Sequence, residues 1–329
     1  MQWAEINGYD LLAYGKTDFE AAALSLYRYQ YSANHLYRRY NELLHIDPEQ
    51  VQRLEQIPYL PISFFKTHRV WSGTEAKEQL LFESSGTTGM TPSRHFVKDA
   101  ALYEVSLLEG FRHFYGDPAA YTYLGLLPSY LERSTSSLVH MAKTLMTQSR
   151  KPGNGFYLNE WERLKTQLLQ LEAAGEAALL LGVTFALLDF SEAYPMSLQQ
   201  VIIMETGGMK GRREEWTRDQ VHELLQQQWQ AAQIHAEYGM TELLSQAYAR
   251  AKGLFVPAPT MSVLVRDLQD PLEVRRSGRG ALNIIDLANV HSCAFIATED
   301  VGYCHADGSF EVLGRMDHVA LRGCSLMAV

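Results

Sequence analysis

Strand-like and helix-like segments alternate through the middle of this 329-residue chain. Short apolar runs typical of buried strands lie at residues 79–82, 121–127, 179–185 and 201–204, and segments with helical apolar spacing lie at 100–115, 161–174 and 221–233. Strands that alternate with helices usually form a largely parallel sheet with helices on both faces. The alternation therefore predicts an α/β fold.

The two ends of the chain show other patterns. Residues 18–44 carry apolar and aromatic side chains at helical spacing, which predicts one or two amphipathic helices with the aromatics in the core. Residues 57–66 contain two prolines and are expected to form an extended connector. After about residue 256, short strands are expected at 262–265, 280–285, 294–298 and 308–313, in an antiparallel or barrel-like region.

No repeat, low-complexity tract or linker interrupts the chain. We therefore expect one continuous domain, with a helical segment at 1–75, an α/β core at 76–255 and a β-rich region at 256–329.

Composition excludes several classes of protein. The chain is 47% hydrophobic and 20% charged, as expected of a globular protein, and its formal net charge of -9 argues against nucleic acid as a partner. The longest apolar run, 177–188, is shorter than the ~20 residues that span a bilayer. The N-terminus lacks a signal-peptide pattern, and three cysteines are too few for a disulfide framework. These features predict a cytoplasmic protein without a membrane span.

Hydroxyl residues and glycines crowd the segment that follows the strand at 79–82. The glycines Gly86 and Gly89 allow backbone N–H groups to approach an anion, and Arg94 adds a positive charge. The hydroxyls belong to Ser84, Ser85, Thr87 and Thr88. The segment predicts a phosphate-binding loop, with an ordinary solvated turn as the alternative. It is not a Walker loop, because Met90 stands where that motif requires lysine.

Three later segments carry groups that suit a nucleotide. Gly207 and Gly208 follow a strand and allow a planar group to lie against the backbone. Residues 238–242 offer an aromatic face in Tyr238, then Gly239, the hydroxyl of Thr241 and the carboxylate of Glu242, a ligand type that Mg²⁺ prefers. Asp300, expected at a strand end, can accept ribose hydroxyls, and Arg315 can pair with a phosphate. Taken singly, the glycine segment is equally consistent with an ordinary strand-ending turn, and the segments of Asp300 and Arg315 are each more often surface turns with a salt bridge.

Together these four segments resemble the signature motifs of the adenylate-forming superfamily, which includes acyl-CoA synthetases, luciferase and adenylation domains. A closer resemblance is to the acyl-protein synthetase of bacterial bioluminescence. It is carried by the aromatic N-terminal helices and by residues 60–66, 127–134, 298–302 and 322–326. That family activates a fatty acid with ATP as acyl-AMP, captures the acyl group on a cysteine near its C-terminus and passes it to a partner reductase.

The resemblance implies roles for individual residues. It implies that the phosphate loop consists of Ser84, Ser85, Gly86, Thr87, Thr88 and Gly89, and that the adenine pocket consists of Gly207, Gly208 and Tyr238 beside Gly239. Thr241 and Glu242 would contact phosphate and Mg²⁺. Asp300 would bind the ribose, and Arg315 would contact the nucleotide. Two departures stand out. Arg94 lies near the position where many members have lysine, and the sequence stops at Val329, so we expect the mobile C-terminal domain of the larger members to be absent.

Cys324 matters most for the fate of the acyl group. Arg322 favours its thiolate, and the resemblance implies that it accepts the acyl group, whereas the alternative is an inert thiol packed at a chain end. Cys293 and Cys304 lie in apolar strand contexts and are expected in the core; a zinc site formed by these two with His291 and His305 is the less favoured alternative. His140 and Tyr130 are further candidates to line an acyl pocket.

These observations predict an ATP- and Mg²⁺-dependent enzyme that activates a carboxylic acid, expected to be a fatty acid, as acyl-AMP and transfers the acyl group to a thiol. Its predicted catalytic residues are Cys324, Arg94 and Thr241, and an acyl-acceptor protein such as a reductase or acyl carrier is the expected partner. Two alternatives stay open: a ligase that uses the external thiol of CoA or of an acyl carrier protein, and a non-catalytic module that binds AMP and an acyl group.

Overall fold

The chain crosses four times between two units in this computed structural model, which describes residues 7–85, 91–128, 135–208 and 216–316. The first unit contains Met1–Gly110, Thr241–Gln246 and Val256–Val329, and the second contains Phe111–Met240 and Ala247–Phe255. Helix α5 (Ala100–Tyr115) and strand β10 (Leu254–Pro257) each contain one of these boundaries. The organisation into three consecutive segments of one domain stays a prediction.

The second unit is built on parallel strands in the order β5-β4-β6-β7-β8. These strands are β4 (Thr122–Leu126), β5 (Gly155–Phe156), β6 (Ala178–Gly182), β7 (Val201–Glu205) and β8 (His235–Tyr238), and β9 (Ala247–Ala249) is antiparallel to β8. Every residue of β6 is buried, as expected for a strand with both faces covered.

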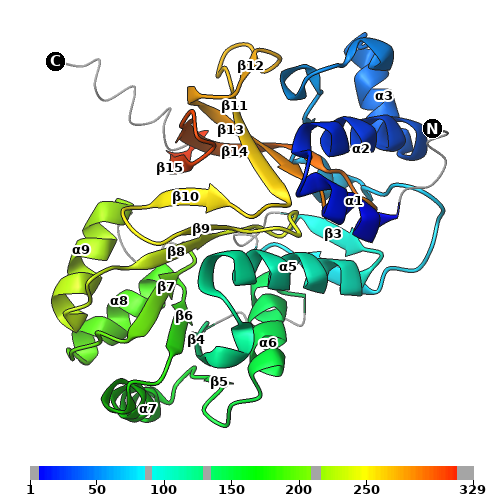
Figure 1. The fold of residues 1–329 in the computed structure, drawn as a ribbon. Coiled ribbons are helices and arrows are strands. Elements are labelled where there is room, and N and C mark those ends of the chain that lie inside the picture. The colour runs from blue at the N-terminus through cyan, green and yellow to red at the C-terminus, as the bar shows by residue number, and fades with distance from the viewer. Residues whose placement is uncertain (1–6, 86–90, 129–134, 209–215, 317–329) are drawn as a thin grey trace, which may run out of the picture. The chain divides into compact units, whose positions relative to one another are not determined.

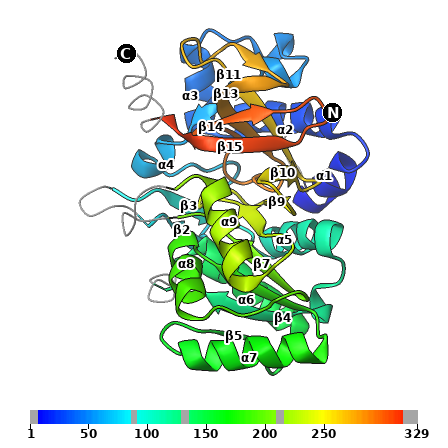
Figure 2. The ribbon, with the colours of Figure 1, turned by 90° about the vertical axis from the view of Figure 1, so that its left-hand side faces the viewer.

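Helices surround these parallel strands. They are α6 (Ser137–Ser149), α7 (Trp161–Ala174), α8 (Thr184–Ala193) and α9 (Arg218–Trp229), with the short 3₁₀ turn η3 at Pro118–Ala120. Figures 1 and 2 show α8 and α9 on one face of the strands and α6 on the other. Local chemistry sets the helix ends: Thr217 and Gln220 form a capping box at the start of α9, and Gly175 ends α7 with φ 64°.

The first unit contains an antiparallel sheet in the order β12-β11-β13-β14-β15. Its strands are β11 (Met261–Arg266), β12 (Val274–Arg275), β13 (Gly278–Asp286), β14 (Phe295–Cys304) and β15 (Phe310–Arg315), and β1 (Leu60–Pro61) pairs in parallel with β14. A separate pair is formed by β2 (Leu80–Glu83) and β3 (Arg94–Val97). The helical elements are α1 (Gly8–Gly15), α2 (Phe19–Ala33), α3 (His35–Leu43), α4 (Phe64–Thr67), η1 (Pro48–Gln50) and η2 (Leu54–Gln56).

Aromatic side chains attach the N-terminal helices to this sheet. Tyr37 of α3 is fully buried and stacks on Phe295 of β14, with ring centroids 6.0 Å apart and planes at 18°. Tyr27 meets both rings edge-on, and the Tyr37 hydroxyl donates to the carbonyl of Pro58. Buried aromatics contribute more apolar contact than other side chains, and their hydroxyls need such partners. The prediction that the aromatics of residues 18–44 belong to the core is confirmed for Tyr27 and Tyr37, whereas Phe19, Tyr31 and Tyr40 are half-buried.

The predicted α/β fold is confirmed, and so is the antiparallel region that follows it. Several boundaries were wrong. The strand expected at 294–298 extends to Cys304 in β14. The strand expected at 179–185 ends at Gly182, because Thr184 begins α8; the helix expected to reach 233 ends at Trp229, where Gln230 adopts φ 49°; and the extended connector contains the short helix α4. Within the described residues, no helix is long and apolar enough to cross a membrane.

Candidate functional site

The ends of the predicted phosphate loop are held together in the first unit. Glu83 and Arg94 are opposite each other at the end of the β2–β3 pair. Beyond them, the Ser84 amide donates to the Ser93 carbonyl (3.0 Å), and the Ser93 amide donates to the Ser84 hydroxyl oxygen (2.8 Å). Ser84 thus fixes the base of the loop. Ser85 is exposed, and Gly86, Thr87, Thr88 and Gly89 lie outside the described residues.

Glu242 is buried beside the base of this loop. Burial raises the pKa of its carboxyl, while a hydrogen bond with Ser93 and the charge of Lys66 lower it and the charge of Asp300 raises it further. The structure therefore brings Glu242, Ser93, Asp300 and Lys66 into one neighbourhood of the first unit. Lys66 and Ser93 were not predicted as site residues, although Lys66 closes the 60–66 segment that carries part of the resemblance.

Buried polar groups hold the backbone around Glu242. Oδ2 of Asp286 accepts from the amides of Leu244 (2.7 Å) and Ser245 (3.0 Å), and Oδ1 accepts from the Ser245 hydroxyl (2.6 Å). The Asn289 side-chain amide donates to the Glu242 carbonyl (2.8 Å). We call Asp286 and Asn289 the clamp, because they fix the segment that carries Thr241 and Glu242.

His95 supports the same segment from β3. Its Nδ1 lies 2.9 Å from the carbonyl oxygen of Thr241, and a carbonyl only accepts, so Nδ1 carries the proton. Burial lowers the pKa of His95 to about 4, so the ring is neutral at pH 7. His95 therefore acts on Thr241 through its backbone.

Asp300 lies inside β14 and not at a strand end, which corrects the sequence prediction. It pairs in register with Arg315 of β15, next to a register shift between Val301 and Gly302. The Arg315 guanidinium, however, donates to the neighbouring Glu299. Asp300 itself keeps the regular register with β15, and its side chain is half-buried. Arg94 is exposed on β3, with its guanidinium 5.9 Å from the Phe96 ring.

The predicted adenine-pocket residues belong to the second unit. Gly207 and Gly208 adopt φ 74° and 91°, and a Cβ atom added to either would meet nothing within 4 Å. Their backbone is therefore open to a flat ligand, and glycine is needed for the conformation. Tyr238 ends β8 with its ring 5.8 Å from that of Phe255, and Gly239 follows it as an exposed residue.

A buried carboxylate fixes this glycine turn. Oε2 of Glu205 accepts from the Gly207 amide (2.6 Å) and the Thr184 hydroxyl (3.1 Å), while Oε1 accepts from Arg218 Nε (2.9 Å). Burial alone would raise the pKa of Glu205, but His222 and Arg218 lower it to about 2. Glu205 was not predicted; its only sequence signal is its place directly before the glycine segment.

Glu237, the neighbour of Tyr238, is a second buried carboxyl that was missed. Burial and the charge of Glu205 raise its pKa to about 8, so it is largely protonated at pH 7. His140 lies on α6 of the second unit, and Tyr130 falls outside the described residues.

The thiols separate into two groups. Cys293 and Cys304 are buried, and burial raises the pKa of each to about 12, which suits core packing and not nucleophilic attack. Across the described ranges, no three His, Cys, Asp or Glu side chains are grouped to hold a metal ion, so the zinc alternative is wrong. Cys324 lies outside the described residues.

Comparisons with known proteins agree with the sequence resemblance. Residues 15–100 match the family model of the acyl-protein synthetase LuxE. A comparison with curated proteins found no match.

Solved structures share the fold over most of the chain. A 2-hydroxyisobutyryl-CoA ligase in complex with 2-HIB-AMP is 12% identical, with a TM-score of 0.67 over 92% of this chain and 68% of the ligase. ATP-bound MatB from Rhodopseudomonas palustris is 17% identical, with a TM-score of 0.55 over 74% of this chain and 50% of MatB. A long-chain fatty acid–CoA ligase from Archaeoglobus fulgidus is 16% identical, with a TM-score of 0.51 over 76% of this chain and 55% of that one. The chain thus has the large-domain fold of adenylate-forming enzymes and spans about half the length of MatB.

Proposed function

We propose that this chain activates a carboxylic acid, most simply a fatty acid, with ATP and passes the acyl group to a thiol. The observation that carries the proposal is the grouping of Glu242, Ser93, Asp300 and Lys66 at the base of the 84–93 loop, within the fold of adenylate-forming enzymes. The match to the acyl-protein synthetase family model supports the same reaction class.

In the proposed first step, a carboxylate oxygen of the acid attacks the α-phosphorus of ATP. A P–O bond forms, the bond to the β-phosphate oxygen breaks, and pyrophosphate leaves, so no proton needs to be transferred. The work of the protein is positioning and charge stabilisation. Arg94, Thr241 and the loop residues Ser84–Gly89 are proposed to contact the phosphates.

Other residues are proposed to hold the nucleoside and the metal. The open backbone at Gly207 and Gly208, with Tyr238 and Gly239, would accept adenine, while Asp300 would accept ribose hydroxyls and Arg315 would contact the nucleotide. The oxygen donor of Glu242 fits Mg²⁺, which commonly takes one or two protein carboxylates and completes its shell with phosphates and water. Mg²⁺ would neutralise charge on the triphosphate.

For the second step, we propose that the thiolate of Cys324 attacks the carbonyl carbon of acyl-AMP, forming a thioester and releasing AMP. The buried thiols Cys293 and Cys304 are poor nucleophiles because of their raised pKa values. An acyl-acceptor protein, such as a reductase or an acyl carrier, would take the group onward. A ligase that uses CoA or an acyl carrier directly is the competing proposal, since the structural neighbours include CoA ligases.

The first expected result is pyrophosphate release from Mg-ATP that depends on a carboxylic acid. The site offers groups for phosphate charge and none assigned to activating water, so AMP and pyrophosphate should appear together. A panel of acids of increasing chain length, assayed for both pyrophosphate and ADP, tests this. ADP formation, or no turnover with any acid, would contradict the proposed function.

The second expected result is a thioester on Cys324 after incubation with ATP and the cognate acid. Intact-mass spectrometry should show an adduct of the acyl mass that hydroxylamine removes. Cys324→Ser should lose the adduct but still release pyrophosphate, and Cys293→Ser is the matched control that keeps it. Robust acyl-CoA formation with an unmodified Cys324 would favour the external-thiol ligase.

A further inference from the structure

Four buried polar atoms that have no hydrogen-bond partner among the described residues belong to residues around one small pocket of the first unit. They are His95 Nε2, Asn289 Oδ1, His291 Nδ1 and Ser292 Oγ. The pocket has a volume of about 10 Å³ and is lined from β3, from the start of α5 and from the segment 288–292 before β14. A buried polar atom without a partner costs free energy, so this group of atoms calls for a ligand that bonds several of them at once.

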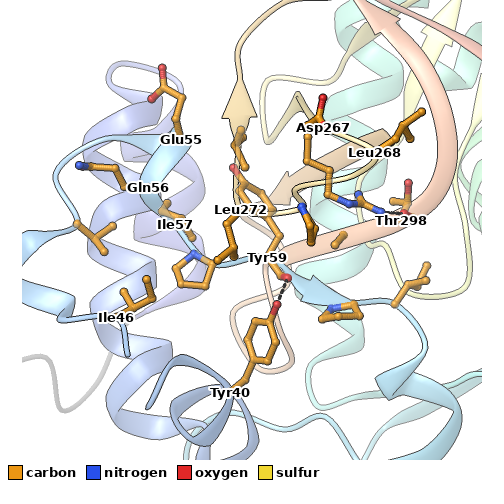
Figure 3. Close-up of a pocket in the computed structure, with 18 of the residues that line it drawn as sticks. Tyr40, Ile46, Glu55, Gln56, Ile57, Tyr59, Asp267, Leu268, Leu272 and Thr298 are labelled. Carbon is orange, nitrogen blue, oxygen red and sulfur yellow. Dashed lines mark hydrogen bonds between the residues drawn. The ribbon is translucent and has the colours of Figure 1, made fainter. Parts of the chain in front are cut away.

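A larger pocket of the same unit does not have this property. Figure 3 shows this pocket, of about 600 Å³, in which the Tyr40 hydroxyl donates to the Tyr59 carbonyl (3.1 Å). Within the described part of the chain, no residue that lines it has a buried side-chain atom without a partner. The unmatched atoms at the small pocket are therefore a feature of that pocket and not of pockets in this unit generally.

The hydrogen bond that His95 makes fixes its Nε2 atom as an acceptor. Burial lowers the pKa of His95 to about 4, so the ring carries a single proton at pH 7. That proton is on Nδ1, which donates to the Thr241 carbonyl (2.9 Å). Nε2 therefore has a lone pair to offer and no proton.

Asn289 offers a second acceptor near the first. Its Nδ2 group faces two acceptors, the Glu242 carbonyl (2.8 Å) and Oδ2 of Asp286 (3.4 Å), which fixes the orientation of the amide. The Asn289 side chain is close enough to His95 to raise the pKa of the ring against the effect of burial, yet neither Oδ1 nor Nε2 has a hydrogen-bond partner in the described ranges. Two acceptors cannot bond to each other, so they need a donor with two protons between them.

We propose that one water molecule binds in this pocket and donates one O–H group to His95 Nε2 and the other to Asn289 Oδ1. Its lone pairs accept from the Ser292 hydroxyl and from a proton on His291 Nδ1. Buried waters typically make about three such bonds, and a volume of about 10–15 Å³ is enough to hold one.

This water links two supports of the same segment. His95 holds the Thr241 carbonyl from β3, and Asn289 of the clamp holds the Glu242 carbonyl. A water between them couples the two supports, so it positions Thr241 and Glu242 without touching ATP. The positioning role rests on the proposed function, whereas the binding of the water does not.

Two measurements on the wild-type protein test the water directly. Nitrogen-15 NMR of the histidine rings at pH 7 should show His95 neutral, with its proton on Nδ1. A crystal structure should show one water within about 3.2 Å of both His95 Nε2 and Asn289 Oδ1. A proton on Nε2, which could donate to Asn289 directly, overturns the proposal, and so does a pocket that holds a metal ion or no water.

Ser292→Ala tests the water by the sign of a stability change. A buried hydroxyl without a partner opposes folding, so its removal would raise the urea midpoint, whereas the loss of a hydroxyl bonded to a bound water should lower it. We expect the lower midpoint. Ser277→Ala, at an exposed residue between β12 and β13, is the matched control and should leave the midpoint unchanged. An unchanged or higher midpoint for Ser292→Ala contradicts the proposal.

The same variant tests the positioning role. Under conditions where Ser292→Ala is fully folded, kcat for pyrophosphate release should fall about threefold or more while KM for ATP stays the same, because small displacements of positioning groups slow the reaction. An unchanged kcat would overturn the positioning role. If the wild-type protein releases no pyrophosphate with any acid, the proposed function fails, and the NMR spectrum, the crystal structure and the urea midpoints still decide whether the water binds.

Discussion

Glu242→Gln is expected to lower acid-dependent pyrophosphate release by roughly 100-fold, because loss of one preorganised group at developing phosphate charge typically costs that much. Glutamine keeps the shape and accepts the hydrogen bond from Ser93, but it loses the charge that would hold Mg²⁺. The rate should be measured over a range of Mg²⁺ concentrations, where the variant should need more metal.

Glu242→Gln should still fold, because the pKa of the Glu242 carboxyl shows that its charge does not stabilise the folded state. Burial raises the folded-state pKa of Glu242 above its unfolded value, so at pH 7 the ionised carboxyl opposes folding. Removing that charge therefore costs no stability, and urea unfolding should give an unchanged or higher midpoint. Glu49→Gln, at an exposed residue of the same unit, is the matched control. Near-normal pyrophosphate release in Glu242→Gln would mean that the metal and triphosphate bind elsewhere.

Long periodic segments were predictable because their local pattern and their packing agree. The helix expected at 161–174 matches α7, and the strand expected at 201–204 matches β7 within one residue. The region 178–193 failed because it is apolar throughout, so periodicity does not show where β6 ends and α8 begins. Short strands such as β8 and β9 lack a pattern of their own and depend on their neighbours in the sheet.

The candidate site likewise contains some residues that could be predicted from the sequence and others that could not. Glycines and hydroxyl residues indicate a ligand-binding loop through properties of the residues themselves, such as the backbone conformations that glycine can adopt. Gly207 and Gly208 could therefore be singled out from the sequence. The groups that hold those loops are ordinary polar residues whose role comes from burial. Glu205 and Asp286 look like any carboxylates in the sequence, yet their side chains fix the segments that carry Gly207 and Glu242.

Asp286→Asn should be the most damaging of these supporting changes, lowering the free energy of unfolding by about 2–5 kcal/mol. Asp286 is fully buried and accepts from the amides of Leu244, Ser245 and Ala288 (2.7, 3.0 and 3.0 Å). An asparagine has one acceptor oxygen, and its NH₂ group would face N–H donors, leaving buried groups without partners. Because Asn289 links the same clamp to the Glu242 carbonyl, pyrophosphate release should fall as well.

The matched control is Asp307→Asn, since Asp307 also accepts from an amide and a hydroxyl, those of Ser309 (3.0 and 2.6 Å), but in an exposed turn. Water can replace its lost bonds, so it should cost less than about 1 kcal/mol. Urea unfolding measures both variants. Pyrophosphate release at a temperature where both are folded should show a lower kcat for Asp286→Asn alone, because displacing Glu242 affects the reacting phosphates and not merely the folded fraction. Equal stability and equal kcat in the two variants would show that the clamp does not position Glu242.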